Sequence, residues 1–319
     1  MLAVYADHFD AHDPLAGLAT GDRPEPTERE GWTTVTVRAA SLNHHDLWSL
    51  RGVGLRAAQL PMILGTDAAG VTDDGREVVV HGVIGADGHG VGPDETRTLL
   101  SEKYPGTLAE RVSVPTHNLV AKPDGLSFEH AACVPTAWLT AYRMLFRSAG
   151  LTPGQSVLVQ GAGGGLATAA IALGAAAGLD VIVTSRTEAK RTAALALGAS
   201  HVVEPGARLP HRVDAVIETV GAATWSHSVK SVRPGGVIAV AGATSGDPTV
   251  TELTRIFFNE ITVRGATMGS REELESLLAF LVRAGVRPTI DSTFPLGQAP
   301  AAFARLASGE QVGKIVLAG

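Results

Sequence analysis

The chain has a single cysteine, Cys133, among its 319 residues. One thiol cannot form a disulfide within the chain or supply a cysteine-rich metal site. Charged residues make up only 18% and the net charge is −6, so no basic surface for nucleic acid is indicated. The longest run of small apolar residues, 166–179, is too short to cross a bilayer, and the first residues are too acidic for a signal peptide. These absences predict a cytoplasmic protein that binds neither nucleic acid nor membrane.

Glycine, in contrast, is abundant, and four of the 37 glycines fall within residues 160–165. An apolar run at 157–159 precedes this turn, an alanine-rich segment at 166–177 follows it, and a β-branched run lies at 181–184. This order of strand, glycine turn, helix and strand is typical of a dinucleotide-binding βαβ unit. A turn without side chains lets a pyrophosphate approach the backbone, and the first helix amides point toward it. The alternative is an ordinary βαβ unit with an unused turn.

The tip of the second strand carries no acidic residue. An NAD site usually has an Asp or Glu there, which binds the ribose hydroxyls. Here the strand ends in Ser185 and Arg186, and Lys190 and Arg191 follow closely. A hydroxyl and cationic groups suit a 2′-phosphate. The sequence therefore favours NADPH over NADH, unless these cations only begin a solvated helix.

Short strands and turns dominate the first part of the chain, which suggests a small, mostly β domain. Residues 1–30 have little periodicity, and residues 82–105 are interpreted as a long loop. Strands are predicted at 32–40, 77–81, 107–114 and 118–122, and Ser127 is a plausible helix N-cap. A helical period follows over 136–149.

Downstream of the glycine turn the pattern alternates between helix and strand, as in a parallel α/β sheet. The predicted elements are helices at 188–197, 224–232 and 271–284, and strands at 201–203, 214–218, 237–241, 262–265 and 314–317.

This ordered set of segments resembles the medium-chain dehydrogenase/reductases, and is nearer to their zinc-independent quinone oxidoreductase branch than to the zinc alcohol dehydrogenases. The matching stretches include LPMILGTDAAGV, LTPGQSVLVQGAGGGLATAA and the closing GKIVL. The resemblance implies an α/β fold in which a Rossmann doubly wound parallel sheet is inserted into a GroES-like β domain. It implies a substrate domain at residues 1–124, completed by 285–319, and an NADP(H)-binding domain at 125–284.

The chain departs from the zinc enzymes at the metal ligands. The positions that hold Cys, His and Cys in those enzymes fall on Asn43, Thr66 and Thr136. An amide and two hydroxyls cannot replace two thiolates and an imidazole around zinc. The four-cysteine structural zinc lobe is missing as well, so no metal is expected.

Without a metal, hydrogen bonds must polarise the substrate. This suits hydride transfer from NADPH to a quinone or to a double bond conjugated with a carbonyl. The resemblance makes Asn43 a donor toward the substrate oxygen, His45 a candidate proton donor, and Thr66 and Thr136 walls of the pocket. The alternatives are a turn-forming Asn43 and a histidine whose hydrogen bonds are all satisfied.

The resemblance also implies the cofactor contacts and the assembly state. The residues implied to contact NADP(H) are Thr140, Gly163, Gly164, Gly165, Leu166, Ser185, Arg186, Lys190, Val220, Gly221, Gly242, Met268 and Gly269. A homodimer joined through the strand edge at 261–265 is expected. A zinc-free alcohol or ketone dehydrogenase and a non-catalytic NADPH-binding protein remain alternative functions.

Overall fold

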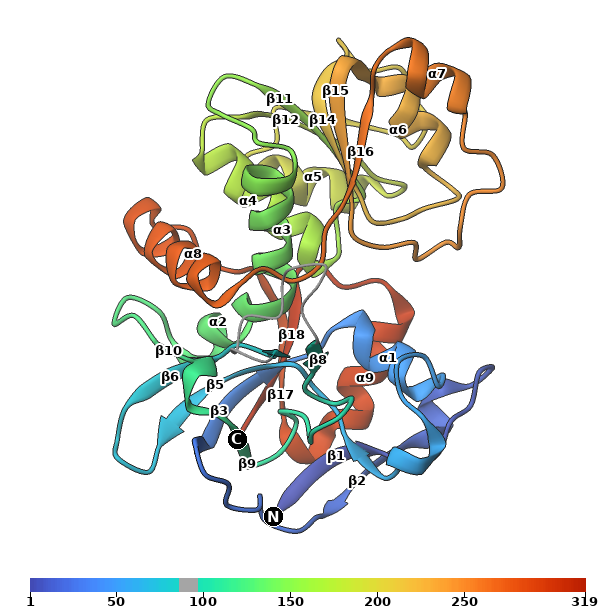
Figure 1. Cartoon of the computed structure of the whole chain (residues 1–319). Helices are drawn as coiled ribbons and strands as arrows, with labels where there is room; N and C mark the ends of the chain where they lie inside the picture. Colours follow the sequence, from blue (N-terminus) through green and yellow to red (C-terminus); the bar gives the residue numbers. More distant parts are fainter. Residues whose placement is uncertain (86–96) are drawn as a thin grey trace. The chain divides into compact units, whose positions relative to one another are not determined.

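The computed structural model describes residues 1–85 and 97–319, and the chain divides into two compact units. Unit 1 comprises Met1–Leu139 and Met268–Gly319, and unit 2 comprises Thr140–Thr267 (Figure 1). The predicted fold class, a Rossmann sheet within a GroES-like β domain, is confirmed. The compact units divide at residues 139 and 267, and the domain boundaries implied by the resemblance, after residues 124 and 284, stay a prediction.

Unit 2 is built on a six-stranded sheet in which every neighbouring pair is parallel. Its strand order, β13-β12-β11-β14-β15-β16, is that of a doubly wound dinucleotide-binding fold. The apolar runs of the sequence become its buried central strands. The strands are β11 (Ser156–Gln160), β12 (Asp180–Thr184), β13 (His201–Val203), β14 (Val213–Glu218), β15 (Val232–Val240) and β16 (Thr262–Gly265).

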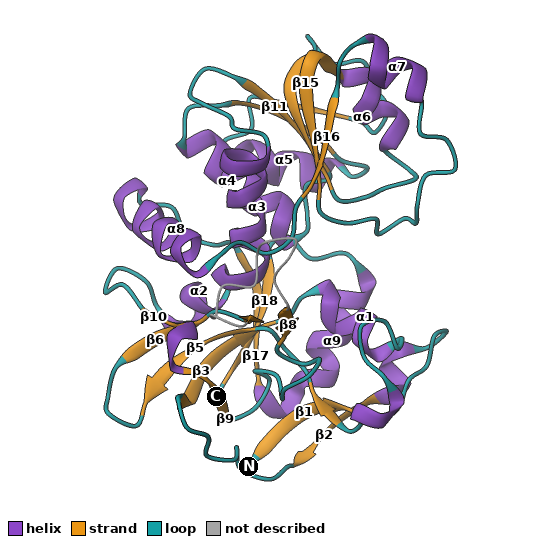
Figure 2. Ribbon diagram, viewed as in Figure 1, coloured by secondary structure: helices purple, strands orange, loops and turns teal. Residues whose placement is uncertain are grey.

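Helices lie on both sides of this sheet (Figure 2). Small residues let the first helix pack close to the sheet, because a Cβ on Gly174 would lie 2.9 Å from Val181 Cγ2. The helices are α4 (Gly165–Ala176), α5 (Glu188–Ala196), α6 (Trp225–Ser231) and α7 (Leu253–Phe258). The segment predicted as helical over 136–149 consists of η4 (Val134–Trp138) and η5 (Met144–Ser148), two π-helical stretches, with α3 (Leu139–Arg143) between them.

Unit 1 is mostly β. Its main sheet has the order β10-β6-β5-β3-β18-β17, and β9 also pairs with β3. The sheet is antiparallel except for the parallel pair β17–β18. Its strands are β3 (Trp32–Ser41), β5 (Asp67–Thr72), β6 (Glu77–Val80), β9 (Arg111–Pro115), β10 (Leu119–Ala121), β17 (Ile290–Pro295) and β18 (Lys314–Ala318).

Smaller elements complete unit 1. Two further sheets contain β1 (Leu2–Ala6), β2 (Leu18–Asp22) and β4 (Met62–Ile63), and β7 (Val83–Gly85) with β8 (Arg97–Leu99). Its α-helices are α1 (His44–Leu50), α2 (Phe128–Ala132), α8 (Arg271–Ala284) and α9 (Ala299–Ser308), and its 3₁₀ turns are η1 (Pro14–Gly17), η2 (Ala57–Gln59), η3 (Thr116–Asn118) and η6 (Leu296–Gln298).

Two expectations about unit 1 were wrong, and one region without a prediction contains strands. Residues 82–105 are not one loop, because β7 and β8 pair within them; residues 86–96 lie outside the described part of the chain. Residues 1–30, for which no element was predicted, contain β1 and β2, which pair with each other in an antiparallel ladder. The strand predicted from residue 107 begins at Arg111, because Leu108 bonds instead with Leu64 and Val4.

Strand β18 joins the two sequence segments of unit 1. It pairs with β3 on one side and β17 on the other, and Ile315 and Leu317 belong to the same apolar core as Val35 and Leu64. This register places the first residue of β18, Lys314, next to the loop that leads into α1. In the described ranges no helix has the length and apolar character that crossing a membrane requires.

Candidate active site

Three of the four predicted catalytic side chains meet in unit 1. Asn43 precedes α1, Thr66 precedes β5, and Thr136 lies in η4. Asn43 Nδ2 lies 3.3 Å from Thr66 Oγ1, which lies 2.9 Å from Thr136 Oγ1. Asn43 and Thr66 are buried, whereas Thr136 is partly exposed. The structure therefore brings these three positions into one hydrogen-bonded cluster.

The centre of this cluster is Asp67, which the sequence pattern did not single out. Its carboxylate is fully buried. Oδ2 accepts hydrogen bonds from Ser41 Oγ and Asn43 Nδ2, both at 2.9 Å. Oδ1 accepts from Thr136 Oγ1 at 2.5 Å. Asp67 thus holds the side chains around it in fixed orientations.

Lys314 supplies the counter-charge. Its ammonium is buried and lies 3.2 Å from Asp67 Oδ2. It also donates to Leu42 O at 2.7 Å and to Asn43 Oδ1 at 2.5 Å. A buried lysine needs such partners, and a lysine that opens an otherwise apolar strand is the one sequence signal that could have pointed to this site.

The hydrogens of the cluster are all committed. Thr136 donates to Asp67, so the proton between the two threonines comes from Thr66. The amide hydrogens of Asn43 point to Asp67 and Thr66. A substrate oxygen would therefore have to compete with Asp67 for the hydroxyl hydrogen of Thr136, the partly exposed member of the three predicted residues.

His45, the fourth predicted catalytic residue, has a different partner. Its Nε2 lies 3.3 Å from Glu102 Oε1. Burial opposes the charged ring, but the hydrogen bond that the ring donates to Glu102 and the negative charges of Asp46, Glu102 and Asp67 outweigh it and raise the pKa of His45. Within the described residues its Nδ1 has no hydrogen-bond partner. His45 therefore keeps a proton more readily than a free histidine does.

Asp46 and Cys133 have structural roles. Asp46 accepts from the backbone N–H of Asn43 at 2.8 Å and of Gly65 at 3.0 Å, which fixes the turn before α1. Burial raises the pKa of Asp46. Cys133 is fully buried, and burial raises its pKa to about 12, so the thiol is unreactive at neutral pH.

The glycine turn of unit 2 has the geometry of an anion site. Gly161 follows β11 with φ +91°, and Gly164 caps α4 without a side-chain hydrogen bond. The backbone N–H of Thr168 is the first in α4 with a helical acceptor, Gly164 O. The N–H groups of Gly165 and Leu166 are therefore oriented toward any ligand at the helix start, where the helix dipole favours an anion.

The cationic residues that follow β12 differ in their partners. Ser185 is buried, and its carbonyl accepts from Arg191 Nη1 at 2.8 Å, so Arg191 supports the backbone of this turn. The backbone N–H of Lys190 bonds to Thr187 at the start of α5. Arg186 is exposed, and no ion pair or hydrogen bond of its guanidinium occurs within the described ranges. Arg186 is thus available to an anionic ligand.

The remaining cofactor candidates lie in both units. In unit 2, Val220 and Gly221 follow β14 and Gly242 follows β15, so they share the carboxyl edge of the sheet with the glycine turn. Thr140 is buried at the start of unit 2. In unit 1, Met268 Sδ lies 3.7 Å from Thr136 Oγ1, and Gly269 O accepts from His81 Nε2 at 2.9 Å; these are the last two of the predicted contacts.

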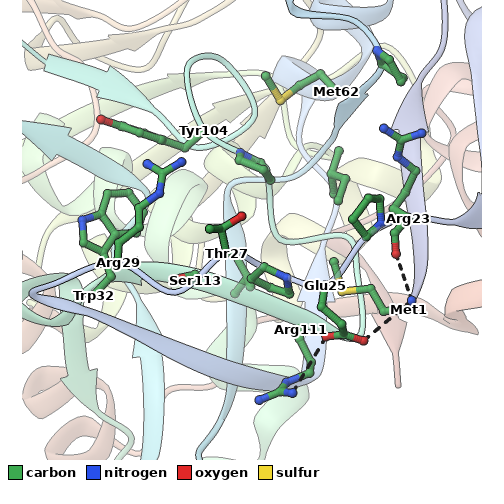
Figure 3. A pocket seen from close by; sticks show the side chains of 16 residues that line it. Met1, Arg23, Glu25, Thr27, Arg29, Trp32, Met62, Tyr104, Arg111 and Ser113 are labelled. Atoms are coloured by element: carbon green, nitrogen blue, oxygen red, sulfur yellow. Dashed lines mark hydrogen bonds and ion pairs between the residues drawn. The ribbon is translucent and has the colours of Figure 1, made fainter.

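A separate pocket of about 260 Å³ opens on unit 1 (Figure 3). Its cationic side chains are already engaged. Arg29 stacks over the rings of Trp32 and Tyr104, at 5.0 and 5.1 Å from their centroids, and Arg111 pairs with Asp73 at 3.1 Å. None of the predicted site residues lines it. In the residues with described placement, no group of three or more His, Cys, Asp or Glu side chains could hold a metal ion.

Comparisons with known proteins agree with the two-part fold. The family described as "Alcohol dehydrogenase GroES-like domain" matches residues 29–124, and the family described as "Zinc-binding dehydrogenase" matches residues 165–283.

Individual relatives match along almost the whole chain. A zinc-type alcohol dehydrogenase-like protein of Schizosaccharomyces pombe is 30% identical, over 97% of this chain and 98% of that protein. An acryloyl-coenzyme A reductase of Metallosphaera sedula is 28% identical, over 94% and 96%. The crystal structure of an NAD-dependent alcohol dehydrogenase is 31% identical, covers 100% of both chains and superposes with a TM-score of 0.90.

Proposed function

This chain belongs to the medium-chain dehydrogenase/reductase superfamily, and from that premise we propose that it is a zinc-independent, NADPH-dependent reductase of quinones or α,β-unsaturated carbonyl compounds. The reduction of a conjugated double bond is supported by the acryloyl-coenzyme A reductase among its relatives. The enzyme is proposed to work as a homodimer.

The observation that carries this proposal is the chemistry of the cluster around Asp67. Zinc takes thiolate, imidazole and carboxylate ligands. Asn43, Thr66 and Thr136 are neutral, and Asp67 already accepts hydrogen bonds from Ser41, Asn43, Thr136 and Lys314. The ammonium of Lys314 would also repel a dication. These residues do not fit a zinc ion.

The same cluster suits a substrate that is polarised by hydrogen bonds. The dinucleotide, when bound, supplies a hydride to carbon, and negative charge then develops on the substrate oxygen. The hydroxyl hydrogen of Thr136, turned from Asp67 to the substrate oxygen, would stabilise that charge. Asn43 bonds to Thr66 and Thr66 to Thr136, which holds Thr136 in place. His45, with its raised pKa, would hold a proton for the product.

The residues of unit 2 fit a dinucleotide phosphate. The N–H groups at the start of α4 would bind the pyrophosphate, because they point away from the helix without helical acceptors. Ser185, Arg186 and Lys190 would hold the 2′-phosphate, and Arg186 is the cation with no other partner in the described ranges.

The test is NADPH oxidation after dialysis against a chelator. The assay offers a small quinone, an α,β-unsaturated ketone and an enoyl thioester, with a saturated ketone as control. We expect turnover with at least one conjugated substrate, none with the saturated ketone, and zinc far below one ion per chain. Turnover that needs stoichiometric zinc would contradict the proposal. Activity restricted to the saturated ketone would assign a zinc-free alcohol or ketone dehydrogenase, and NADPH binding without any turnover would assign a non-catalytic binding protein.

A further inference from the structure

We infer that Glu218 anchors a hydrogen-bond network that positions the turns of the cofactor site, an inference that rests on the proposed function. Gln160, Thr184 and Glu218 are the last residues of β11, β12 and β14, three neighbouring strands of the unit 2 sheet. All three side chains are buried. Three adjacent strands therefore end in buried polar groups at the edge where ligands bind in doubly wound sheets.

The network begins at the glycine turn. The backbone N–H of Gly161 donates to Thr184 Oγ1 at 3.1 Å, and Thr184 donates to Gln160 Oε1 at 2.8 Å. Gln160 Nε2 donates to Ser228 Oγ at 3.0 Å. Ser228 in turn donates to Glu218 Oε2 at 2.5 Å. In each of these bonds the acceptor lies nearer to Glu218 in the series than the donor does, and the series ends at the Glu218 carboxylate. Because a carboxylate only accepts, it determines which group donates in every bond of the series.

The other carboxylate oxygen holds the turn after β14. Oε1 of Glu218 accepts from the backbone N–H groups of Val220 at 2.8 Å and Gly221 at 3.1 Å. Thr224 Oγ1 lies 2.8 and 2.9 Å from the two oxygens. Gly221 has φ +88°, and a Cβ there would lie 2.4 Å from Gly246 O. The turn that carries Val220 and Gly221 therefore depends on Glu218 for its amide acceptors.

The hydrogen bonds of Glu218 come from neutral groups. The side chain is fully buried, and no Lys, Arg or His pairs with it in the part of the chain that the structure describes. A buried carboxylate without a cation is costly unless every lone pair is used. Glutamine has the same shape, but its NH₂ would face the N–H donors of the turn or the hydroxyl of Ser228. Only a carboxylate can accept from both the backbone N–H groups of the turn after β14 and the hydroxyl of Ser228. These bonds connect the glycine turn to the turn after β14.

Asp214 offers a matched control at the opposite end of the same strand. Its Oδ2 accepts from the N–H and the hydroxyl of Ser156, both at 2.8 Å, and its Oδ1 from Arg233 Nε at 2.7 Å. Like Glu218, it ties β14 to neighbouring elements through a carboxylate. It lies at the amino end of β14, away from the cofactor turns.

The test compares Glu218→Gln with Asp214→Asn. NADPH affinity is measured by calorimetric titration, melting temperature by circular dichroism, and backbone hydrogen exchange on the cofactor-free protein. We expect Glu218→Gln to weaken NADPH binding about tenfold or more and to speed exchange at residues 161–166 and 219–224. Asp214→Asn should lower the melting temperature and leave the affinity within about twofold. Equal affinities in the two variants would overturn the positioning role.

A second variant covers the case in which Glu218→Gln does not fold. Ser228→Ala keeps Glu218 and its backbone contacts but removes the link to Gln160. It should speed exchange at residues 161–166 and leave 219–224 protected; unchanged exchange at both segments would contradict the network. If the wild-type protein binds neither NADPH nor NADH, the proposed function fails and the positioning of a cofactor fails with it. The exchange pattern of the cofactor-free variants then shows separately whether Glu218 holds the two turns.

Discussion

Two pairs of oppositely charged side chains in unit 1 differ in their exposure to solvent. Lys314 and Asp67 neutralise each other inside the cluster, at 3.2 Å. His45 and Glu102 pair at 3.3 Å with about a fifth to a quarter of each side chain exposed, at 22% and 25%. His45 is therefore a titratable group near the candidate site that solvent can reach.

Stability should depend on pH through His45. Its pKa is raised from the ordinary value of 6.5, so the folded state binds the proton more tightly than the unfolded state does. The resulting stabilisation is complete below that value and is lost as pH rises through the folded pKa. Glu102→Gln should therefore lower the free energy of unfolding more at about pH 6 than at about pH 9. Denaturant titrations at both pH values measure this.

The exposed pair of His8 and Asp7 supplies the control for that experiment. Both side chains are more than half exposed, so Asp7→Asn should change stability little at either pH. A loss of stability in Glu102→Gln that is the same at both pH values would show that the pair is not linked to the titration of His45.

Cofactor choice should depend on Arg186. Its guanidinium is exposed and without a partner in the described residues, so removing it should cost binding energy only where a 2′-phosphate is present. Arg186→Ala should weaken NADPH binding about tenfold and leave NADH within about twofold. Arg191→Ala is the control, because Arg191 supports the backbone of Ser185 and its loss should weaken both dinucleotides alike. Fluorescence titrations with both cofactors decide; equal wild-type affinities would refute the NADPH preference.

The start and the end of α8 are determined by residues close to them in the sequence. Ser270 Oγ accepts from the N–H of Glu273 at 3.2 Å, and Glu273 Oε2 accepts from the N–H of Ser270 at 2.9 Å. This reciprocal cap begins the helix, and Gly285 ends it with φ +66°. Both signals are visible in the sequence, which is why the predicted bounds of 271–284 are confirmed.

Removing the α8 cap should have a measurable cost. Ser270→Ala leaves the N–H of Glu273 without its acceptor and should lower the free energy of unfolding by about 1 kcal/mol. Ser276→Ala, in the same helix, removes only a hydroxyl that bonds back to Glu272 O and should change it by less than about 0.5 kcal/mol. Chemical denaturation of both variants gives the comparison. Equal effects would show that the cap does not stabilise α8.

Elements of the Rossmann sheet could be predicted because their signal is local. Apolar runs between glycines become strands such as β11 and β12, buried on both faces. The strands β7 and β8 have only three residues each, which is too short for a recognisable alternation. Asp67 was missed for another reason. Its partner, Lys314, lies 247 positions away in the sequence, and the residues next to Asp67 do not indicate this contact.

An exposed apolar surface of unit 2 bears on the assembly of the protein. Strand β16 is exposed along its length and forms an edge of its sheet. On the segments next to it, Leu253, Phe257 and Phe258 are 67%, 62% and 76% exposed. An exposed edge beside such a patch favours pairing with another chain.

A homodimer at micromolar concentration is therefore expected. Val263→Lys on β16 and Phe258→Glu on α7 should each shift the protein toward the monomer, because they place charges on this surface. Val53→Lys, at an exposed valine of unit 1, should leave the dimer intact. Light scattering measures the masses. A wild-type monomer, or a dimer unaffected by both changes in unit 2, would contradict this interface.

The position of β18 in the main sheet of unit 1 has a consequence for biosynthesis. A ribosome makes β3 and β5 first, then all of unit 2, and β18 only afterwards. Unit 2 is continuous in sequence and can fold as soon as it emerges, whereas β3 and Asp67 must wait for β18 and Lys314. A nascent chain would thus complete unit 2 while Asp67 still lacked its cation. The order of translation itself would delay the assembly of the candidate site until β18 was in place.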